Sequence, residues 1–413
     1  MSNVIRGLFV ACVMALVCGG CGAMSGTSDG PTGASVIFIH PDGASSATWA
    51  VGRSVLVGPD GYLNWDRLPH MAIYRDHVTD CLTATSNAGG TIHATGRKVP
   101  AASFGTDGQR DIVRTDDPDK SESVMVQAMR RGLSVGIVNS GSAIEPGTAC
   151  FLTSVPKRQD FQIITAQLVE SGADVMLSGG EEWFLPEGVK GRHAVGKRTD
   201  GRNLLDEARK RGYTVVQTPE ELKAVPDSTA RLLGVFCEEH TFNDQPEEAL
   251  AAKGLPLYRP GTPTVAEMAA AALRVLTAKG KPFLLVVEEE GTDNFGNNNN
   301  AAGMIEAMRR ADEAIGMAVD YVKKHPKTLL LTTADSDAGG MRMVGIKAAG
   351  KVPATLPARD RNGAPVDGMR GGETETWYAA PDRNGVRLPF AIAWATLDDC
   401  SGGMLVKAAG FNA

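Results

Sequence analysis

The sequence of 413 residues has few of the features that mark several common classes of protein. Beyond residue 21 its four cysteines show no two-residue spacing, so no zinc ribbon is indicated. No basic run or basic–aromatic stripe occurs and the net charge is −6, which argues against a nucleic-acid partner. Past the N-terminal apolar run, no segment is long and apolar enough to span a membrane.

Two catalytic signatures are also missing. The first apolar run is not followed by the Gly-x-Gly-x-x-Gly turn of a dinucleotide-binding fold. The candidate nucleophile Ser86 is not in the Gly-x-Ser-x-Gly turn of a serine hydrolase. A chemistry other than hydride or acyl transfer is therefore expected.

Apolar runs and amphipathic stretches alternate along the chain, in an ordinary globular composition of 43% hydrophobic and 22% charged residues. Short continuous apolar runs are typical of strands buried on both faces of a parallel sheet. We therefore predict an α/β fold with a mostly parallel central sheet and helices on both faces. Helices are expected at 121–131, 202–211, 265–278 (with a capping box, Thr264 and Glu267) and 302–324, and further strands at 135–138, 175–177, 214–216, 232–236 and, as the last strand, 388–395.

The N-terminus has the features of an export signal. A positive residue and a short apolar run are followed by small residues before Cys21. This pattern predicts a signal peptide over residues 1–21 with a lipid on Cys21, as in a bacterial lipoprotein; a plain signal peptide cut near Ala23 is the alternative. Residues 22–34, rich in Ser, Gly and Thr, are expected to form a flexible tether. We expect an exported protein of the periplasm or cell envelope, anchored to the membrane only through this lipid.

A serine within a run of small residues is the most informative feature of the rest of the chain. Ser86 is followed by two glycines at 89–90, and nothing bulky shields its hydroxyl group. If a helix begins there, its free N–H groups point at a bound anion. The run predicts a nucleophile or an anion-binding group, and a helix N-cap is the structural alternative.

Three apolar runs, at 36–39, 283–287 and 329–333, are expected to form buried strands and lead directly into acidic residues. Open α/β sheets place their ligands just past the carboxyl ends of strands, so these acids are expected to gather in one place. Crowded carboxylates repel each other, and a bound divalent cation is the usual resolution. For the run 288–290 the alternative is a solvated charge run. The acids are Asp42, Glu288 with Asp293 five residues on, and Asp335.

Six short motifs occur in order from about Ser35 to the C-terminus. They are Asp42-Gly43, Ser86 ten residues before Gly96 in Ala94-Thr95-Gly96, Arg158 after Val155-Pro156, Gly179-Gly180 with Phe184-Leu185-Pro186, the segment from Pro263 to Glu288, and Thr333-Ala334-Asp335. Each motif alone is weak, but the ordered set resembles the metal-dependent alkaline phosphatase family. The resemblance implies one alkaline phosphatase-like domain over 35–413, with a surface insertion near 345–376.

The resemblance also implies an activity. Ser86 would attack phosphorus and form a phosphoserine that water hydrolyses, and Arg158 would hold the phosphoryl oxygens. Two divalent ions would stabilise the attacking and leaving oxygens, with a third, usually magnesium, in support. We expect a phosphomonoesterase for a phosphorylated small molecule; diester substrates and a homodimer are open alternatives. The implied metal ligands are Asp42, Ser86, Glu288, Asp293, Asp335 and Asn297.

The chain departs from the family pattern at the metal ligands. The histidine positions of the pattern carry Asn297, Cys400 and Ser336, and a threonine position falls at Gly147. None of the seven histidines stands at a matched position, so the implied site is nearly all oxygen. Oxygen ligands suit Mg²⁺, Ca²⁺ and Mn²⁺ better than Zn²⁺. Mg²⁺ is therefore the first expectation, and Cys400 would either bind a soft metal or only fill a histidine's place.

Two functions follow from these departures. The first is a phosphatase that works with hard cations. The second is a catalytically inert relative that binds a phosphorylated ligand or a surface partner. Structural alternatives also stand for single residues: Arg158 as a surface arginine, Asn297 in an exposed loop, and His93 and His240 as hydrogen-bonded structural histidines.

Overall fold

The computed structural model describes residues 33–346, 352, 355–360, 363–369 and 375–413. The expected signal peptide, Cys21 and most of the expected tether lie outside these described residues, as do parts of the expected insertion at 345–376. In the described ranges no helix has both the length and the apolar character needed to cross a bilayer.

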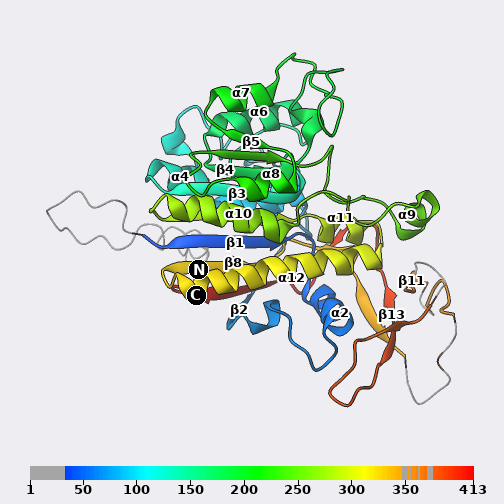
Figure 1. Ribbon diagram of the computed structural model, residues 1–413. Coiled ribbons are helices and arrows are strands. Elements are labelled where there is room, and N and C mark those ends of the chain that lie inside the picture. Colours follow the sequence, from blue (N-terminus) through cyan, green and yellow to red (C-terminus); the bar gives the residue numbers. More distant parts are fainter. Residues whose placement is uncertain (1–32, 347–351, 353–354, 361–362, 370–374) are drawn as a thin grey trace.

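Nine of the described strands form one large sheet in the order β2-β15-β8-β1-β7-β3-β4-β6-β5. Its central strands pair in parallel, as the apolar runs predicted, while β15 pairs antiparallel with β8 and β2. Figure 1 shows β1 and β8 side by side in the middle of the molecule. The strands are β1 (Ser35–Pro41), β2 (His70–Ile73), β3 (Ser134–Ser142), β4 (Val175–Gly179), β5 (Thr214–Val216), β6 (Leu232–Val235), β7 (Phe283–Glu289), β8 (Thr328–Thr332) and β15 (Leu405–Gly410).

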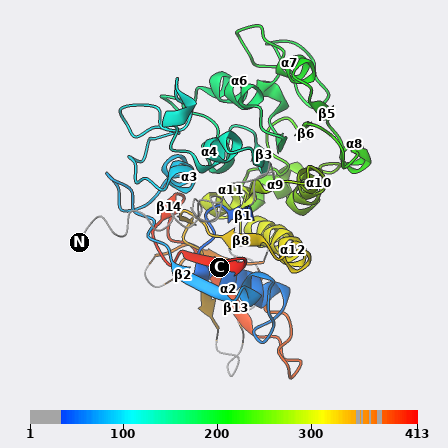
Figure 2. The same ribbon diagram turned by 90° about the vertical axis from the view of Figure 1, so that its left-hand side faces the viewer.

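Helices cover both faces of this sheet, which confirms the predicted α/β architecture (Figure 2). Alternate residues of β1 face the two layers: Val36 and Phe38 pack with α3, α4 and α6, whereas Ile37 and Ile39 pack with α10 and α12. The helices are α2 (Ser46–Leu56), α3 (Ser86–Thr95), α4 (Val124–Arg130), α5 (Pro146–Ala149), α6 (Phe161–Ser171), α7 (Leu204–Lys210), α8 (Pro219–Ala224), α9 (Glu247–Lys253), α10 (Val265–Ala278), α11 (Gly291–Asn297) and α12 (Ala301–Lys324).

Local signals set several helix ends. Helix α10 has the predicted bounds and capping box, in which Thr264 and Glu267 each accept a backbone N–H of the other. Helix α4 begins later than predicted, at Val124, because the hydroxyl group of Ser123 caps it. These caps satisfy N–H groups that the first helical turn leaves without partners.

The prediction that 388–395 is the last strand is wrong. That segment forms β13 (Pro389–Ala393) in a smaller antiparallel sheet with β10 (Arg342–Gly345), β11 (Val366–Asp367) and β12 (Trp377–Tyr378). The last strand is β15, which the sequence did not indicate because Lys407 interrupts a weakly apolar run. The ammonium group of Lys407 is accommodated by the backbone oxygen of Trp65 at 2.6 Å.

Glu247 at the start of α9 makes stability depend on pH. Partial burial, with the charge of Asp367, raises the pKa of Glu247 from 4.5 to about 8. The protonated form is therefore favoured in the folded state, and its contribution is complete below pH 4.5 and lost as pH rises through about 8. Glu247→Gln keeps the acceptor for the N–H of Ala302 and removes the charge.

We expect the free energy of unfolding to fall between pH 5 and 9 by on the order of 1–2 kcal/mol more in the wild type than in Glu247→Gln. Thermal unfolding across this range is the measurement, with the exposed neighbour Glu248→Gln as the matched control. Parallel pH profiles for the wild type and Glu247→Gln would contradict the assignment.

Candidate active site

Three neighbouring strands end in the acids that the sequence singled out. Strand β1 lies between β7 and β8, and residue 40 in β1 is in register with Glu288 in β7. Asp42, Glu288 and Asp335 are completely buried at this edge of the sheet. The predicted gathering of the strand ends is thus what the pairing of β1, β7 and β8 produces.

A histidine that the sequence motifs did not indicate lies between these carboxylates. The Nε2 atom of His40 is 3.3 Å from Asp42 Oδ1 and 3.8 Å from Asp335 Oδ1, and its Nδ1 atom is 3.3 Å from Glu288 Oε1. The ring also contacts His93 edge-on, with ring centroids 4.9 Å apart. A signal was present in the sequence, because His40 lies near the end of β1 and Asp42 is the first residue after that strand, so both belong to the same strand end.

The cluster is electrostatically strained without a cation. Burial opposes a charge on His40, but the carboxylates, Asp42 first, outweigh it and raise the pKa of its imidazole well above the usual range. Burial and the charge of Asp335 raise the pKa of Asp42 well above its usual range. Burial also acts on Asp335, where contacts with His40 and Asp42 prevail and lower its pKa. Burial and the charge of His40 lower the pKa of His93 to about 3.

Ser86 is the first residue of helix α3. Thr85, not Ser86, is the N-cap, since the Thr85 hydroxyl group accepts the N–H of Ala88. Ser86 is 7% exposed, and its hydroxyl group makes no hydrogen bond to any described residue. The hydroxyl group is therefore free to act on a ligand at a helix N-terminus, where anions are favoured.

Glycine brings helix α3 against the carboxylate cluster. A Cβ atom at Gly89 would lie 2.0 Å from Asp335 Oδ2, so only a residue without a side chain permits this approach. The two glycines at 89–90, which the sequence analysis noted for their small size, thus place Ser86 at the same sheet edge as Asp335.

Gly89→Ala is expected to push Asp335 or α3 out of place. We expect phosphatase activity to fall by roughly 10-fold or more and the free energy of unfolding to fall by about 1–3 kcal/mol, the usual cost of overpacking. Gly345→Ala is the matched control, because a Cβ there would meet no atom of a described residue within 4 Å. Equal activities of the two variants in a steady-state assay would refute the steric argument.

Three consecutive glutamates stand at the end of β7, and their side chains point in different directions. Glu288 faces His40 and accepts a hydrogen bond from Asn139. Glu289 faces away and accepts from Ser140 and Tyr258, both at 2.8 Å. All three glutamates are buried, so the run is not a solvated charge run. The oxygens of Asp42, Glu288 and Glu290 also lie close enough together for one ion.

A second group of polar residues follows in helix α11. The amide nitrogen of Asn297 donates to Asp293 at 3.1 Å and to Asp399 at 3.2 Å, and its oxygen accepts the N–H of Gly339 at 3.0 Å. In this arrangement Asn297 orients two carboxylates, and its role as a metal ligand stays a prediction. Asp399, the neighbour of Cys400, is an acid of this group that the motif comparison missed by one residue.

Cys400 and Gly147, two positions at which the chain departs from the family pattern, lie near these groups. Asp337 pairs with Arg342 at 2.6 Å. Cys400 lies in β14 (Asp399–Cys400), which pairs with β9 (Asp337–Ala338). At Gly147 a Cβ atom would lie 1.7 Å from Glu288 Oε1, and the neighbouring hydroxyl group of Thr148 accepts a hydrogen bond from Asn139 at 2.9 Å.

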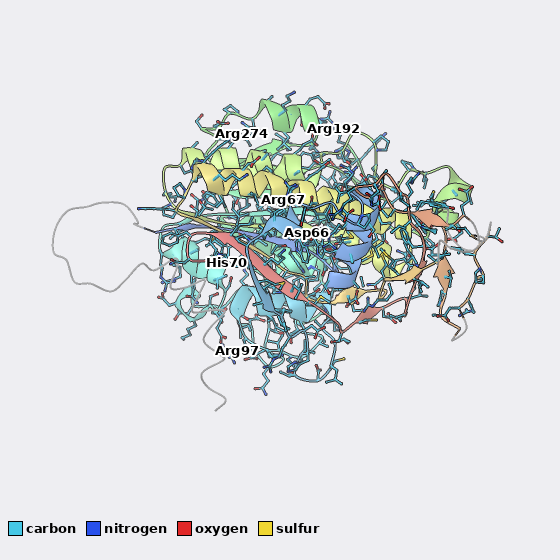
Figure 3. All side chains as sticks on the ribbon, turned by 90° about the horizontal axis from the view of Figure 1, so that it is seen from below. Asp66, Arg67, His70, Arg97, Arg192 and Arg274 are labelled. Atoms are coloured by element: carbon cyan, nitrogen blue, oxygen red, sulfur yellow. The ribbon has the colours of Figure 1, made fainter. Side chains whose placement is uncertain are left out.

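Arg158 differs from the arginines on the outer surface. Arg97, Arg192 and Arg274, labelled in Figure 3, pair with acids at the exterior. The acids that act on Arg158 include Glu290, Asp293 and Asp42 of the site. Arg158 donates to Glu145 at 2.7 Å, and no second hydrogen bond from its guanidinium group occurs within the described part of the chain. Burial opposes its charge, but Glu145 and other acids of the site outweigh it and raise its pKa. Arg158 thus keeps donors free beside the carboxylates.

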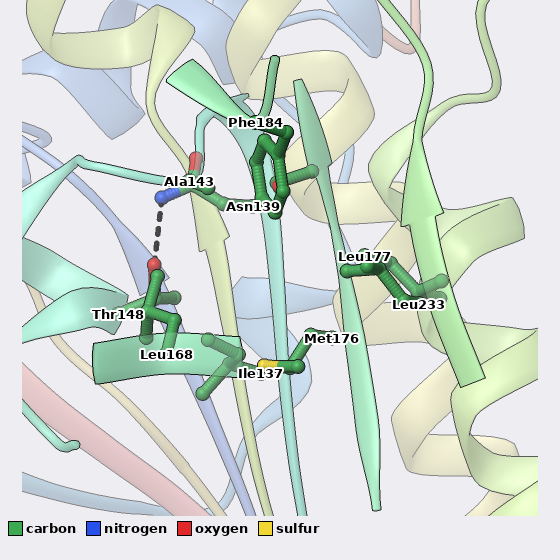
Figure 4. A pocket seen from close by; sticks show the side chains of 10 residues that line it. Ile137, Asn139, Ala143, Thr148, Leu168, Met176, Leu177, Phe184 and Leu233 are labelled. Carbon is green, nitrogen blue, oxygen red and sulfur yellow. Dashed lines mark hydrogen bonds between the residues drawn. The ribbon is translucent and has the colours of Figure 1, made fainter. Parts of the chain in front are cut away.

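The enclosed cavity next to β3 is not the substrate site. Its volume is about 10 Å³, close to the space that one water molecule needs. Figure 4 shows the apolar lining from Ile137, Met176 and Phe184, with the hydrogen bond between Asn139 and Thr148 at one side. The cavity therefore has room for about one water molecule and not for a substrate.

Comparison with known proteins agrees with this geometry. A model of the alkaline phosphatase family matches residues 34–375.

The chain belongs to the alkaline phosphatase family.

Two relatives show how far the likeness extends. The streptomycin-6-phosphate phosphatase of Streptomyces griseus is 27% identical over 341 residues, which cover 73% of either chain. The alkaline phosphatase of Escherichia coli K12 is 26% identical over 346 residues, covering 73% of this chain and 69% of that one. The alkaline phosphatase of the Antarctic bacterium TAB5 has the same fold, with a TM-score of 0.66, 18% identity and 91% of both chains covered; a variant of it was solved with Mg bound.

Family membership confirms two predictions made from the ordered motifs, the fold and an alkaline phosphatase-like phosphomonoesterase. Members of this family use divalent metal ions, and the chain's own residues fit such a group. Among the described residues, the buried carboxylate oxygens of Asp42 and Asp335 have no hydrogen-bond partner. Both buried ring nitrogens of His40 also lack one. Buried atoms of this kind are satisfied by a cation.

Proposed function

We propose that this protein is an exported, metal-dependent phosphomonoesterase that forms a phosphoserine at Ser86. The observation that carries the proposal is the free hydroxyl group of Ser86 at the N-terminus of α3. Gly89 allows this helix to lie directly against Asp335. A phosphorylated small molecule is the proposed substrate, and a monoester is favoured over a diester because the family relatives are phosphomonoesterases.

Ser86 would carry the covalent step. Its hydroxyl group loses its proton as Oγ forms a bond to phosphorus. The P–O bond to the alcohol breaks, and the departing oxygen keeps the electron pair and takes up a proton. Water then attacks the phosphoserine, which releases phosphate and restores the hydroxyl group. The low exposure of Ser86 limits the water molecules that compete with the substrate.

Arg158 would bind the phosphoryl group. Glu145 fixes one side of the guanidinium group, and the remaining N–H groups can donate to two phosphoryl oxygens. This fixed geometry lowers the entropic cost of orienting phosphorus toward Ser86.

The proposed ion ligands are the residues that the family resemblance implies. Divalent ions bound there would neutralise the carboxylates and stabilise the charge on the attacking and leaving oxygens. Mg²⁺ is the ion that the oxygen ligands favour, with Zn²⁺, Ca²⁺ and Mn²⁺ as alternatives. The ligands are Asp42, Ser86, Glu288, Asp293 and Asp335, with Asn297 in the second group.

Hydrolysis of p-nitrophenyl phosphate by the purified full-length protein tests the proposal. The protein is stripped of metals, and Mg²⁺, Ca²⁺, Mn²⁺ and Zn²⁺ are then added back separately. We expect activity that depends on an added ion, and weaker hydrolysis of bis-p-nitrophenyl phosphate. No hydrolysis of either ester with any ion would contradict the proposal and favour an inert relative that binds a phosphorylated ligand.

We also propose that the protein is held at the periplasmic or cell-envelope side of a membrane by a lipid on Cys21. The support is the apolar run, the small residues before Cys21 and the Ser/Gly/Thr-rich segment that follows. Expression in a bacterial host with a labelled fatty acid should label the wild type and not Cys21→Ser. A labelled Cys21→Ser protein, or an unlabelled wild type, would refute the lipid anchor.

A further inference from the structure

The imidazole ring of His40 lies beside both Asp42 and Asp335, so it can supply the third ligand of an ion bound between these two carboxylates. The ring is fully buried, and neither of its nitrogens has a hydrogen-bond partner among the described residues. Its Nε2 atom is 3.3 Å from Asp42 Oδ1 and 3.8 Å from Asp335 Oδ1. All of these ligand atoms lie within 4.8 Å of one another.

These separations suit a shared ion. Zinc–nitrogen and zinc–oxygen bonds of about 2.0–2.2 Å at tetrahedral angles place ligand atoms about 3.4 Å apart. The two distances from His40 Nε2 lie near this value.

The other side of the ring has the partner that a metal-bound imidazole requires. Nδ1 faces Glu288 Oε1 at 3.3 Å, and a histidine bound to a metal through one nitrogen usually donates its other N–H to a carboxylate. Gly147 leaves room for this arrangement, because a Cβ atom there would lie 2.7 Å from His40 Nδ1. Asn139 donates to the second oxygen of Glu288 and fixes its carboxylate.

We propose that His40 Nε2 ligates a divalent ion together with Asp42 and Asp335, and that Glu288 accepts the Nδ1–H instead of binding this ion. The inference deepens the proposed function, on which it rests for the presence of an ion at this site. An imidazole ligand shifts preference from Mg²⁺ or Ca²⁺ toward borderline ions such as Zn²⁺ and Co²⁺.

Co²⁺ binding to the metal-stripped, full-length protein tests this assignment. Proton NMR of the wild type with Co²⁺ should show a strongly shifted signal that exchanges in D₂O, from the Nδ1–H of the bound imidazole. This readout needs no variant and no activity. Absence of such a signal from protein that has bound Co²⁺, or no Co²⁺ binding at all, would overturn the proposal.

Variants identify the histidine. His40→Gln should abolish the shifted signal and weaken Zn²⁺ binding, measured by titration calorimetry, by roughly 100-fold or more, since even partners outside the ligand shell cost 10–100-fold. His93→Gln and His240→Gln are the controls: both rings are buried, and neither is assigned to the ion. Retention of the signal in His40→Gln, or its loss only in His93→Gln, would overturn the assignment.

A parallel assay separates this inference from the phosphatase proposal. Hydrolysis with Mg²⁺, combined with Co²⁺ binding that gives no imidazole signal, would refute the role of His40 and leave the phosphatase standing. A shifted signal that depends on His40, without hydrolysis of any phosphate ester, would uphold the ligand and refute the enzyme.

Discussion

Ser86→Ala is expected to lower the hydrolysis of a phosphate monoester by at least about 1,000-fold, because the variant has no atom that can form the bond to phosphorus. The free energy of unfolding should change by less than about 0.5 kcal/mol. The hydroxyl group of Ser86 makes no hydrogen bond to a described residue, and the cap of α3 is the side chain of Thr85. The activity assay and thermal unfolding of the same sample check both parts.

Ser54→Ala is the matched control for this variant. Ser54 is also a helical serine, and its hydroxyl group donates only to the carbonyl oxygen of Ala50 in α2. Its replacement should leave activity unchanged. Trapping of labelled phosphate on the wild type, but not on Ser86→Ala, would link the lost activity to the covalent step. A Ser86→Ala protein that retains a tenth of the activity would refute a nucleophilic serine.

Asp293→Asn is expected to separate function from stability. Burial, and then the charge of Asp399, raises the pKa of Asp293 well above its usual range, so its ionised form is costly in the metal-free protein. An amide of the same shape removes this cost. We expect the metal-free variant to be more stable than the wild type by on the order of 1 kcal/mol, as is common where a functional group is held under strain.

The same variant should lose its response to metal. A ligand whose free concentration is 100 times its Kd stabilises the folded state by about 2.7 kcal/mol. Weaker metal binding by Asp293→Asn should make this stabilisation smaller. Activity should fall by roughly 100-fold or more. Asp320→Asn, an exposed position in α12 that pairs with Lys323, is the control that should change neither property. A metal-free Asp293→Asn that unfolds more easily than the wild type would contradict the repulsion argument.

The sequence was sufficient for the parts of the site that follow from strand ends. Asp42 and Asp335 each come directly after an apolar run, and parallel pairing of β1 with β8 brings such ends together whatever the loops do. Ser86 could be placed because small residues around a hydroxyl group have a direct steric meaning. The fold class followed from the same apolar runs.

His40 and Asp399 were missed for different physical reasons. His40 stands at no motif position, and only its place two residues before Asp42, at the end of β1, connects the two. Asp399 follows a long segment in which insertions shift any comparison of positions, and its contact with Asn297 depends on how β14 folds back onto β9. Strand β15 was not recognised because the charged Lys407 interrupts its apolar residues; its pairing with β8 and β2 supplies the backbone hydrogen bonds that define it.

The pairing of β1 with β7 has a consequence for how the molecule assembles. The side chain of Ser35 accepts the N–H of Phe283, 248 residues further along the chain. Contacts between such distant residues slow folding, because a long loop must close before any contact repays its entropy. The cluster of His40, Asp42 and Asp335 cannot form until β8 has been synthesised, so an ion that binds there would be captured late. Such an ion would join two segments that are far apart in the sequence and that no short-range contact connects.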